Sequence, residues 1–360
     1  MRIGLYGGLL SGGGAERVLS TLANCLSARG HEVTFFADRK TEGEYHLDGG
    51  VDLVYLGDSG ESFAERNFRR TRALREKIGE KGIQVLLSFL AAPSFRAACA
   101  ARGTDAAHVL SVRNDPAREY PGMSRILARA LFARSAAIVF QTSAAMESFM
   151  DVKTSRRTVI ANPVPDSCFI ECDPRTSCKV VTLGRLNEQK NQAVLIDAFA
   201  EVARGDDEAI LEIYGEGELD AELRERINKR GLEGRAFLMG RTNEPGEALK
   251  GAGVFVLSSD YEGMPNALME AMAAGVPVVT TDCPIGGPGE LVVDGESGFL
   301  VPVGDAHAMA AALSRLLSDG DLRSRMGERG RMGMIAYRTD AVVDAWEAVL
   351  REACGGSDER

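Results

Sequence analysis

Residues 254–280 read VFVLSSDYEGMPNALMEAMAAGVPVVT, and the order of elements in this stretch decides the fold. The apolar run Val254–Ser258 has the length and composition of a buried strand. The residues up to Gly275 are interpreted as a loop and a helix, because Pro265 fits the first turn of a helix. A second apolar run, Val276–Thr280, follows. Strand, helix and strand in this order predict an α/β fold with a parallel sheet.

The same alternation recurs on both sides of Asn162-Pro163-Val164-Pro165. Two prolines two residues apart fit neither a helix nor a central strand, so we place a hinge there. The sequence predicts two Rossmann-like doubly wound domains, at 1–163 and 164–335, with a C-terminal helix within 336–360 that crosses back to the first. Further strands are predicted at Arg2–Tyr6, Glu32–Phe36, Gln84–Ser88, Ala107–Val112, Ala136–Phe140, Thr158–Ile160, Lys179–Leu183, Ile210–Tyr214 and Ala236–Gly240.

Length and composition agree with this organisation. A chain of 360 residues suits about two domains, and 45% hydrophobic with 26% charged residues is typical of a soluble protein. No run approaches the roughly 20 apolar residues of a membrane span, and the first residues do not resemble a signal peptide. Seven scattered cysteines favour a reducing compartment, so we expect a cytoplasmic protein.

Charge is distributed unevenly. Residues 1–165 contain 22 Lys and Arg against 17 Asp and Glu, a net charge of +5, whereas the whole chain carries −10. The acidic balance argues against a nucleic-acid partner. The positive first half could face a phosphate or an anionic membrane surface.

The first turn is rich in glycine, from Gly7 to Gly14. Backbone amides of Gly13 and Gly14 at a helix N-terminus would form a seat for phosphate or another anion. A permissive turn without a ligand is the alternative. The dinucleotide fingerprint fails because Arg17 stands where its third glycine belongs, but Asp38 has the position of a ribose-binding acid, so a nicotinamide dehydrogenase remains a rival.

The second half contains two further candidate segments. Gly184, Arg185 and Lys190 follow a predicted strand, at the edge where open α/β sheets bind ligands. A planar guanidinium and a point charge together suit a diphosphate. Glu262 precedes the helix that starts near Pro265, and Glu270 lies inside it. Carboxylates accept hydrogen bonds from hydroxyls, so the two segments together suit a sugar linked to a nucleoside diphosphate.

These motifs resemble retaining glycosyltransferase family 4, with its two-domain GT-B fold and an active site in the interdomain cleft. The resemblance rests on the glycine-rich turn, Arg185 with Lys190, the E-x7-E pair Glu262 and Glu270, and the hinge. It implies catalytic roles for Arg185, Lys190 and Glu262. The donor-binding residues that it implies are Gly13, Gly14, Gly184, Arg185, Lys190, Gly240, Arg241, Glu262, Gly263, Met264, Pro265, Asn266, Ala267 and Glu270.

The resemblance also implies a chemistry. A UDP-linked sugar would be transferred with retention, the leaving diphosphate being stabilised by Arg185, Lys190 and loop amides, without a cofactor or divalent metal. Two segments, Arg113–Pro116 and Cys283–Pro288, are similar to the branch that builds bacterial surface and lipid-linked glycans. The expected acceptor is therefore a glycan or a polyprenyl-diphosphate-linked sugar. A non-catalytic sugar-nucleotide-binding homologue is the second rival.

One feature departs from the family pattern. Many members carry a histidine after a strand of the first domain, where this chain has Arg113 and Asn114, which we assign to the acceptor side. His108 at the strand start is interpreted as structural.

Weaker signals favour structural roles. Asp319-Gly320-Asp321 imitates a metal motif but lies between predicted helices, as a turn would. The cysteines at 168, 172 and 178 have no neighbouring histidine, so no metal site is expected. The histidines at 31, 46 and 307 are expected at the surface or in turns.

A helix predicted at Phe63–Ile78 carries a basic face that includes Arg66, Arg69, Arg70 and Arg72. A solvated surface is one interpretation. The sharper hypothesis is that this face contacts anionic lipid headgroups or a lipid diphosphate, so that the enzyme lies peripherally on the inner face of the cell membrane.

Overall fold

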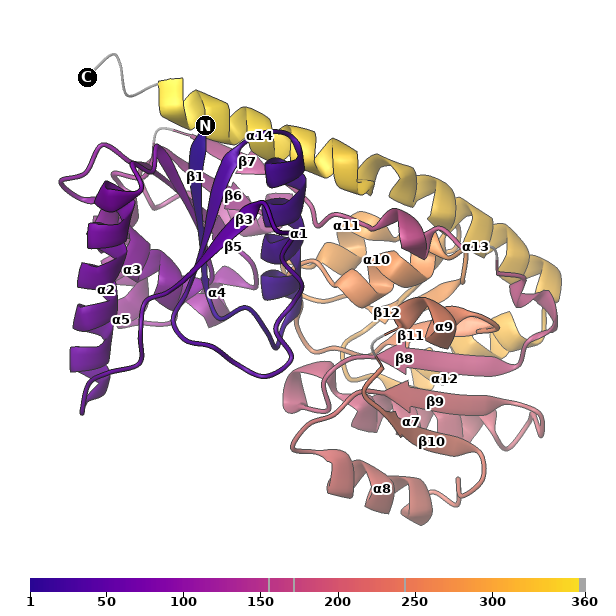
Figure 1. The fold of residues 1–360 in the computed structure, drawn as a ribbon. Coiled ribbons are helices and arrows are strands. Elements are labelled where there is room, and N and C mark those ends of the chain that lie inside the picture. The colour runs from indigo at the N-terminus through magenta and orange to yellow at the C-terminus, as the bar shows by residue number, and fades with distance from the viewer. Residues whose placement is uncertain (155, 171, 243, 356–360) are drawn as a thin grey trace. The chain divides into compact units, whose positions relative to one another are not determined.

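A computed structural model describes residues 1–154, 156–170, 172–242 and 244–355. The chain forms two compact units, one built from Met1–Pro163 with Asp340–Arg360 and the other from Val164–Thr339. Figure 1 shows that each unit has a central sheet flanked by helices. The end of the tail, 356–360, lies outside the described residues.

Unit 1 contains a seven-stranded sheet, and all of its strand pairs are parallel. The strand order is β3-β2-β1-β4-β5-β6-β7, so the direction of winding reverses between β1 and β4. The strands are β1 (Arg2–Gly8), β2 (Glu32–Ala37), β3 (Val51–Tyr55), β4 (Val85–Phe89), β5 (Ala107–Val112), β6 (Ala137–Phe140) and β7 (Arg157–Val159). The helices are α1 (Gly14–Ala28), α2 (Phe63–Glu80), α3 (Ala91–Ala101), α4 (Pro116–Glu119), α5 (Met123–Phe132), α6 (Ser143–Ser148) and α14 (Thr339–Gly355).

Helix α14 completes the core of unit 1 although it is the last element of the chain. Val342, Val343, Trp346 and Leu350 are buried in one cluster with the apolar side chains of α1, β1, β2 and β4. The Trp346 ring lies 5.6 Å from the ring of Phe89 at the end of β4. The apolar stripe of α14 is therefore covered by the sheet and α1, as a helix with that spacing requires.

Unit 2 repeats the plan with six parallel strands in the order β10-β9-β8-β11-β12-β13. Its winding reverses between β8 and β11. The strands are β8 (Lys179–Leu183), β9 (Ile210–Tyr214), β10 (Ala236–Gly240), β11 (Val254–Leu257), β12 (Val278–Thr281) and β13 (Gly298–Val301). The helices are α7 (Gln192–Val202), α8 (Asp220–Lys229), α9 (Pro245–Leu249), α10 (Asn266–Ala273), α11 (Gly287–Leu291), α12 (Ala306–Leu317) and α13 (Gly320–Met334), and short 3-10 turns lie at Asp166–Cys168, Pro174–Thr176, Glu188–Lys190 and Ile335–Tyr337.

The sequence predicted the α/β class and the two parallel sheets correctly but missed two strands. Strand β3 is an edge strand in which only Val51 is buried, but four of its five residues are apolar, and sequence reasoning overlooked this signal. Strand β13 has only four residues and begins with Gly298. Pro265 is the N-cap of α10, one position before the predicted first turn.

His31 was expected at the surface or in a turn; it directly follows the turn at residues 29–30, but it is buried, at 8% exposed. Its Nε2 lies 3.0 Å from Glu347 Oε1 of α14, and its Nδ1 lies 3.3 Å from the amino group of Met1. The packing of α14 against the rest of unit 1 buries this histidine. Its contact with Glu347, 316 residues away, cannot be predicted from the local sequence.

Within the described part of the chain, no helix combines the length and the apolar character that a bilayer crossing needs.

We predict that replacing Glu347 with Gln weakens the docking of α14 at neutral pH. Arg351, Arg29 and His31 all donate to this carboxylate, and they lower its pKa from 4.5 to about 2. A depressed carboxyl pKa stabilises the fold above its unfolded value and loses that effect as the pH falls toward the folded value. The difference in thermal midpoint between wild type and Glu347→Gln should therefore be largest at pH 6–7 and shrink below about pH 4.

Glu147→Gln is the matched control, because Glu147 is exposed in α6 of the same unit. A difference between wild type and Glu347→Gln that stays constant from pH 7 to pH 3 would contradict the ion-pair explanation.

Candidate functional site

The candidate site of unit 2 is at the carboxyl ends of β8 and β11, which are neighbours in the sheet. Chain connections leave these two strands in opposite directions, and open α/β sheets bind ligands outside the strand ends at such a reversal. Gly184 and Arg185 directly follow β8, and residues 258–262 follow β11. The fold therefore brings the two predicted motifs of the second half to one edge.

An ion pair joins the two motifs. Lys190 Nζ lies 2.5 Å from Glu262 Oε1, and the two side chains are only 16% and 8% exposed. Ser259 donates its hydroxyl to the same carboxylate oxygen at 2.6 Å. Ionised pairs in partly buried positions interact more strongly than exposed ones, because less water screens them. Sequence reasoning found both charged residues but missed Ser259.

Hydrogen bonds between the two loops fix Lys190. The 3-10 turn Glu188–Lys190 is capped by Asn187, which accepts a hydrogen bond from the Lys190 amide. Ser258 donates its hydroxyl to the carbonyl of Lys190 at 2.8 Å, and Asn191 donates to the carboxylate of Asp260 at 2.7 Å. Because the backbone of Lys190 is held from both sides, its ammonium group is directed at Glu262.

Arg185 differs from Lys190 in its surroundings. It is exposed, and its guanidinium forms no ion pair with another described residue. Its carbonyl accepts a hydrogen bond from the buried Gln192 at 2.9 Å, which holds the backbone. The structure therefore presents one paired and one solvent-facing cation along the same loop.

Two glycines that follow β9, Gly215 and Gly217, pack directly against the backbone of the loop that carries Arg185. A Cβ at Gly215 would lie 1.8 Å from the Gly184 carbonyl oxygen, and one at Gly217 would lie 2.1 Å from the Leu186 carbonyl oxygen. The Leu186 amide donates to the carbonyl of Glu216 between them at 2.9 Å. Only glycine permits such close backbone contact. The pattern Gly-x-Gly directly after β9 was the available signal, and sequence reasoning missed it.

Gly240 and Arg241 lie at the end of the edge strand β10, with β9 between them and β8. The Gly240 carbonyl accepts a hydrogen bond from the Gly215 amide at 2.8 Å. This bond links the predicted base-facing segment to the glycine pair. Arg241 is exposed.

The loop ahead of α10 is held by a second glycine contact. The Gly287 amide donates to the Gly263 carbonyl at 2.7 Å, and a Cβ at Gly287 would lie only 2.3 Å from that oxygen. Ile285, in the segment between β12 and α11 that leads to Gly287, has a φ of 60°, a strained value for a β-branched residue. The buried Cys283 donates its thiol to the Ser259 carbonyl at 3.2 Å. Burial raises the pKa of this thiol to about 11, so it stays protonated.

Helix α10 places the remaining predicted residues. Met264 and Pro265 are buried, whereas Gly263, Asn266 and Ala267 are half-buried at its N-terminal end, which is the positive end of the helix dipole. Glu270 is 4% exposed, one turn inside the helix.

In unit 1, the two residues that the sequence analysis assigned to the acceptor side have different surroundings. Arg113 is buried, with its guanidinium 4.3 Å from the ring centre of Phe89, and it donates to Asn162. Burial lowers its pKa to about 9. Asn114 is half-buried. The buried carboxylate of Glu119 accepts the amides of Arg113 and Asn114, both at 3.0 Å, and burial raises its pKa to about 7. Sequence reasoning missed Glu119.

The glycine-rich turn leads into α1, with Gly13 as its N-cap and Gly14 as its first residue. The Gly13 carbonyl accepts a hydrogen bond from the Tyr45 hydroxyl at 3.1 Å.

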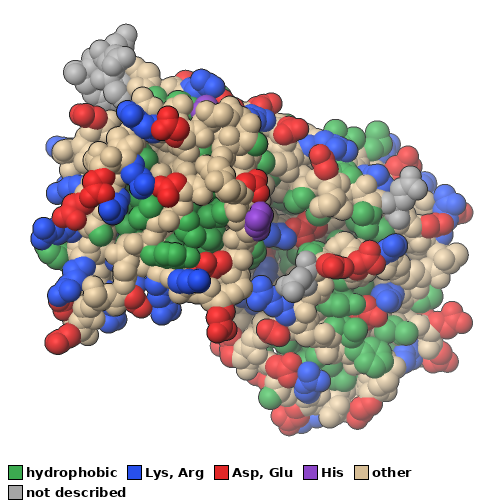
Figure 2. Space-filling view, in the orientation of Figure 1, with side chains coloured by type: hydrophobic (Ala, Val, Ile, Leu, Met, Phe, Trp, Pro, Cys, Tyr) green, Lys and Arg blue, Asp and Glu red, His purple; other side chains and the backbone are tan. Residues whose placement is uncertain are grey.

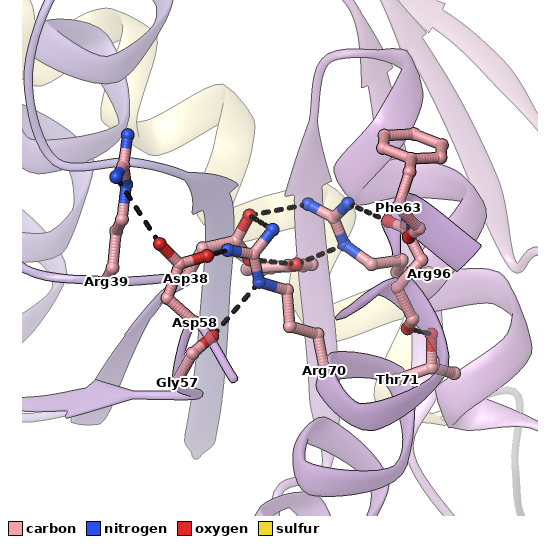
Figure 3. Close-up of polar contacts among 10 residues, drawn as sticks. Asp38, Arg39, Gly57, Asp58, Phe63, Arg70, Thr71 and Arg96 are labelled. Carbon is pink, nitrogen blue, oxygen red and sulfur yellow. Dashed lines mark hydrogen bonds and ion pairs between the residues drawn. The ribbon is translucent and has the colours of Figure 1, made fainter. Parts of the chain in front are cut away.

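Asp38 is not available as a ribose-binding acid. It is 7% exposed, accepts a hydrogen bond from Tyr6 at 2.6 Å, and lies 2.9 Å from Arg96 and 3.2 Å from Arg70 (Figure 3). Three internal donors occupy most of the roughly four acceptor sites of this carboxylate, and its burial leaves little access for a ribose. This geometry argues against the dehydrogenase reading.

Two of the weaker sequence features, His108 and Asp319, make structural contacts. His108 is buried between the hydroxyls of Ser88 and Ser135, at 2.9 and 3.0 Å, and burial lowers its pKa to about 3. Asp319 caps α13 through the Leu322 amide. No group of three or more His, Cys, Asp or Glu side chains among the described residues could hold a metal ion.

Family models match both halves of the chain. A model described as "Glycosyl transferases group 1" matches residues 173–332, and one described as "Glycosyltransferase Family 4" matches residues 12–167. The first contains the whole Lys190–Glu262 site.

Curated relatives match over the full length. A Campylobacter jejuni alpha-1,4-N-acetyl-D-galactosaminyltransferase, named for an undecaprenol-diphosphate-linked acceptor, is 25% identical over 98% of this chain and 99% of its own. The amylovoran biosynthesis glycosyltransferase AmsD of Erwinia amylovora is also 25% identical, over 96% of this chain and 98% of its own.

Solved structures share the fold. Sucrose-phosphate synthase from Thermosynechococcus elongatus aligns with a TM-score of 0.85 at 18% identity, covering 99% of both chains. Anabaena HepE, solved with UDP and glucose, aligns with a TM-score of 0.84 at 16% identity, covering 98% of this chain and 99% of its own. The chain therefore has the fold of these two structures.

We predict that Gly287→Ala destabilises unit 2, because its Cβ would overlap the backbone of the loop that carries Glu262. Forcing a side chain into a packed position costs about 1–3 kcal/mol. Gly333→Ala is the matched control, since no atom outside the neighbouring backbone of α13 lies within 4 Å of its Cβ position. Alanine in a helix stabilises by about 0.5–1 kcal/mol relative to glycine, so chemical denaturation should shift in opposite directions for the two variants. Equal shifts would contradict the close contact.

Proposed function

The chain belongs to the GT-B glycosyltransferases of family 4, and on that premise we propose that it transfers a sugar from UDP to a lipid-linked glycan with retention of configuration. The observation that carries the proposal is the Lys190–Glu262 pair at the reversal point of unit 2. Relatives in bacterial surface-glycan synthesis and a fold neighbour solved with UDP support the donor and the acceptor class.

The site's charges suit departure of a diphosphate. As the bond between sugar and phosphate lengthens, negative charge grows on the phosphate oxygen. Arg185 is the solvent-facing cation of the β8 loop, and Lys190 already points into the site. In this proposal both cations, together with the positive end of α10, stabilise the leaving group, which is preorganised electrostatic catalysis.

Glu262 has a different task in the proposal. Its carboxylate accepts from Lys190 and Ser259, and hydroxyl groups of the donor sugar would compete for the same acceptor. Binding of the donor would thereby turn the Lys190 ammonium from the carboxylate toward phosphate oxygens. Glu270, buried inside α10, would bind the ribose of the nucleotide.

We also propose that α2 contacts an anionic membrane surface. Its arginines are partly neutralised, since Arg69 pairs with Glu65 and Arg72 with Glu76. Blue and red side chains alternate over this part of unit 1 in Figure 2, without a continuous field of either colour. Exposed Phe63 and Phe68, at 75% and 69%, add apolar surface to the same helix.

We predict that Arg185→Ala and Lys190→Ala each reduce turnover about 100- to 1000-fold, the usual effect of losing one preorganised donor. The readout is transfer from UDP-sugars to a lipid-linked acceptor, with the anomeric configuration of the product determined by NMR. Arg204→Ala, a cation beyond the end of α7, serves as control. Retention of more than half of the activity by Lys190→Ala would remove the diphosphate assignment, and an inverted product would remove the retaining assignment.

We predict full transferase activity in excess EDTA. In this proposal, Arg185, Lys190 and the positive end of α10 supply the charge that a divalent ion supplies in other transferases. Activity that disappears with EDTA and returns only with Mg²⁺ or Mn²⁺ would overturn metal independence.

We predict that Arg69→Glu with Arg72→Glu lowers co-sedimentation with phosphatidylglycerol vesicles at least ten-fold, because each basic residue near an anionic surface contributes about 1 kcal/mol. Arg224→Glu with Lys229→Glu is the matched control, since these exposed, ion-paired residues of α8 undergo the same charge change in unit 2. Equal loss in both double variants would show a net-charge effect and refute membrane contact through α2.

A further inference from the structure

A second charged cluster lies in unit 1, at the carboxyl ends of β1, β2 and β3 (Figure 3). Asp38 follows β2, Asp58 follows β3, Arg70 is on α2 and Arg96 is on α3. The Asp38 amide donates to the Gly8 carbonyl at 2.6 Å, so the cluster borders the start of the glycine-rich turn. This edge of a parallel sheet is where α/β proteins bind ligands.

The inner half of the cluster is internally satisfied. Arg96 donates to the Tyr6 hydroxyl at 2.5 Å, to Asn67 at 2.7 Å and to Asp38 at 2.9 Å. The side chains of Arg96 and Asp38 are each 9% exposed. A buried pair with its hydrogen bonds made is a structural link between the sheet, α2 and α3.

The outer half has an excess of positive charge. Arg70, 14% exposed, lies 3.2 Å from Asp38, donates to the Gly57 carbonyl at 3.1 Å and pairs with Asp58. Arg39, 56% exposed, lies 3.4 Å from the same Asp58 carboxylate. Because Asp38 is shared with Arg96, the exposed carboxylate of Asp58 balances two guanidinium groups.

Asp58 is the least constrained member of the cluster. Its side chain is 43% exposed, and it lies between Gly57 and Gly60, with φ values of 100° and 138°. Glycine adopts these angles without strain, so the loop can change conformation at little cost. Two guanidinium groups directed at one exposed oxyanion form the arrangement that binds phosphate oxygens.

We propose that Arg39 and Arg70 form a phosphate subsite, and that Asp58 occupies it until the phosphate of an anionic acceptor displaces the carboxylate. The proposal deepens the proposed function, because it rests on an acceptor that carries a diphosphate. A diphosphate brings more negative charge than a carboxylate, so the exchange is favourable next to two arginines. Arg96 and Asp38 stay paired and hold Arg70 in place.

The test measures binding of inorganic pyrophosphate to the full chain by calorimetry at about 0.05 M salt, where exposed charges are weakly screened. All variants carry Arg185→Ala and Lys190→Ala, which removes the proposed donor-site cations from the measurement. Asp58→Asn should bind pyrophosphate roughly five-fold more tightly than its parent, the effect of freeing one exposed ion pair. Adding Arg39→Ala to Asp58→Asn should abolish the gain.

Glu76→Gln is the matched control. It releases Arg72 from an exposed ion pair on the same helix and changes the net charge by the same amount, outside the cluster. Unchanged affinity in Glu76→Gln supports the subsite. Equal gains in Glu76→Gln and Asp58→Asn, or no gain in Asp58→Asn, would overturn it.

A second arm identifies the source of the phosphate. Phosphatidylcholine vesicles carry either a polyprenyl diphosphate or phosphatidylglycerol at matched charge. A gain for Asp58→Asn confined to the polyprenyl diphosphate supports the acceptor assignment, and an equal gain for both vesicles overturns it. Pyrophosphate binding is measured without turnover. If the wild-type chain showed no transferase activity, the proposed function would be contradicted, but the binding result for Asp58→Asn would remain valid.

Discussion

The ion pair between Lys190 and Glu262 joins two loops that are 72 residues apart in sequence and ties the site of unit 2 together. Both side chains are nearly buried, so each requires the other, and removing one partner leaves a costly unpaired charge. The pair exists because β8 and β11 are neighbours although they are far apart along the chain. The hydrogen bonds of Asn187 and Ser258 hold the backbone of Lys190, and that of Ser259 holds the Glu262 carboxylate.

Backbone packing makes this arrangement specific. Gly215 and Gly217 lie against the loop that carries Arg185, and Gly287 lies against the loop that carries Glu262. A Cβ at any of these three glycines would overlap a backbone oxygen of the facing loop. Any larger residue would therefore push the loop away from its present position. The loops that carry the charged side chains are therefore packed closely on the sheet through glycine contacts.

Burial gives charged residues of similar type different roles. Arg113, Arg96 and Asp38 are each less than a tenth exposed and are held by partners inside unit 1, which makes them parts of the scaffold. Arg39 and Asp58 are exposed members of the same kind of network and are free to exchange partners with a ligand. The sequence alone does not indicate whether a given arginine is a buried scaffold residue or an exposed one. That depends on which other residues of the folded chain cover it.

The sequence alone determined the α/β class, the two parallel sheets and the charged motifs that meet at the ends of β8 and β11, because apolar runs of strand length and motifs such as Glu262-x7-Glu270 are local patterns. It also indicated the family. Only the tertiary structure decided the burial of His31 under α14, the internal pairing of Asp38 and the support of Lys190 by Ser258. Each of these depends on contacts between residues distant in sequence, and local propensity and periodicity contain no information about such contacts.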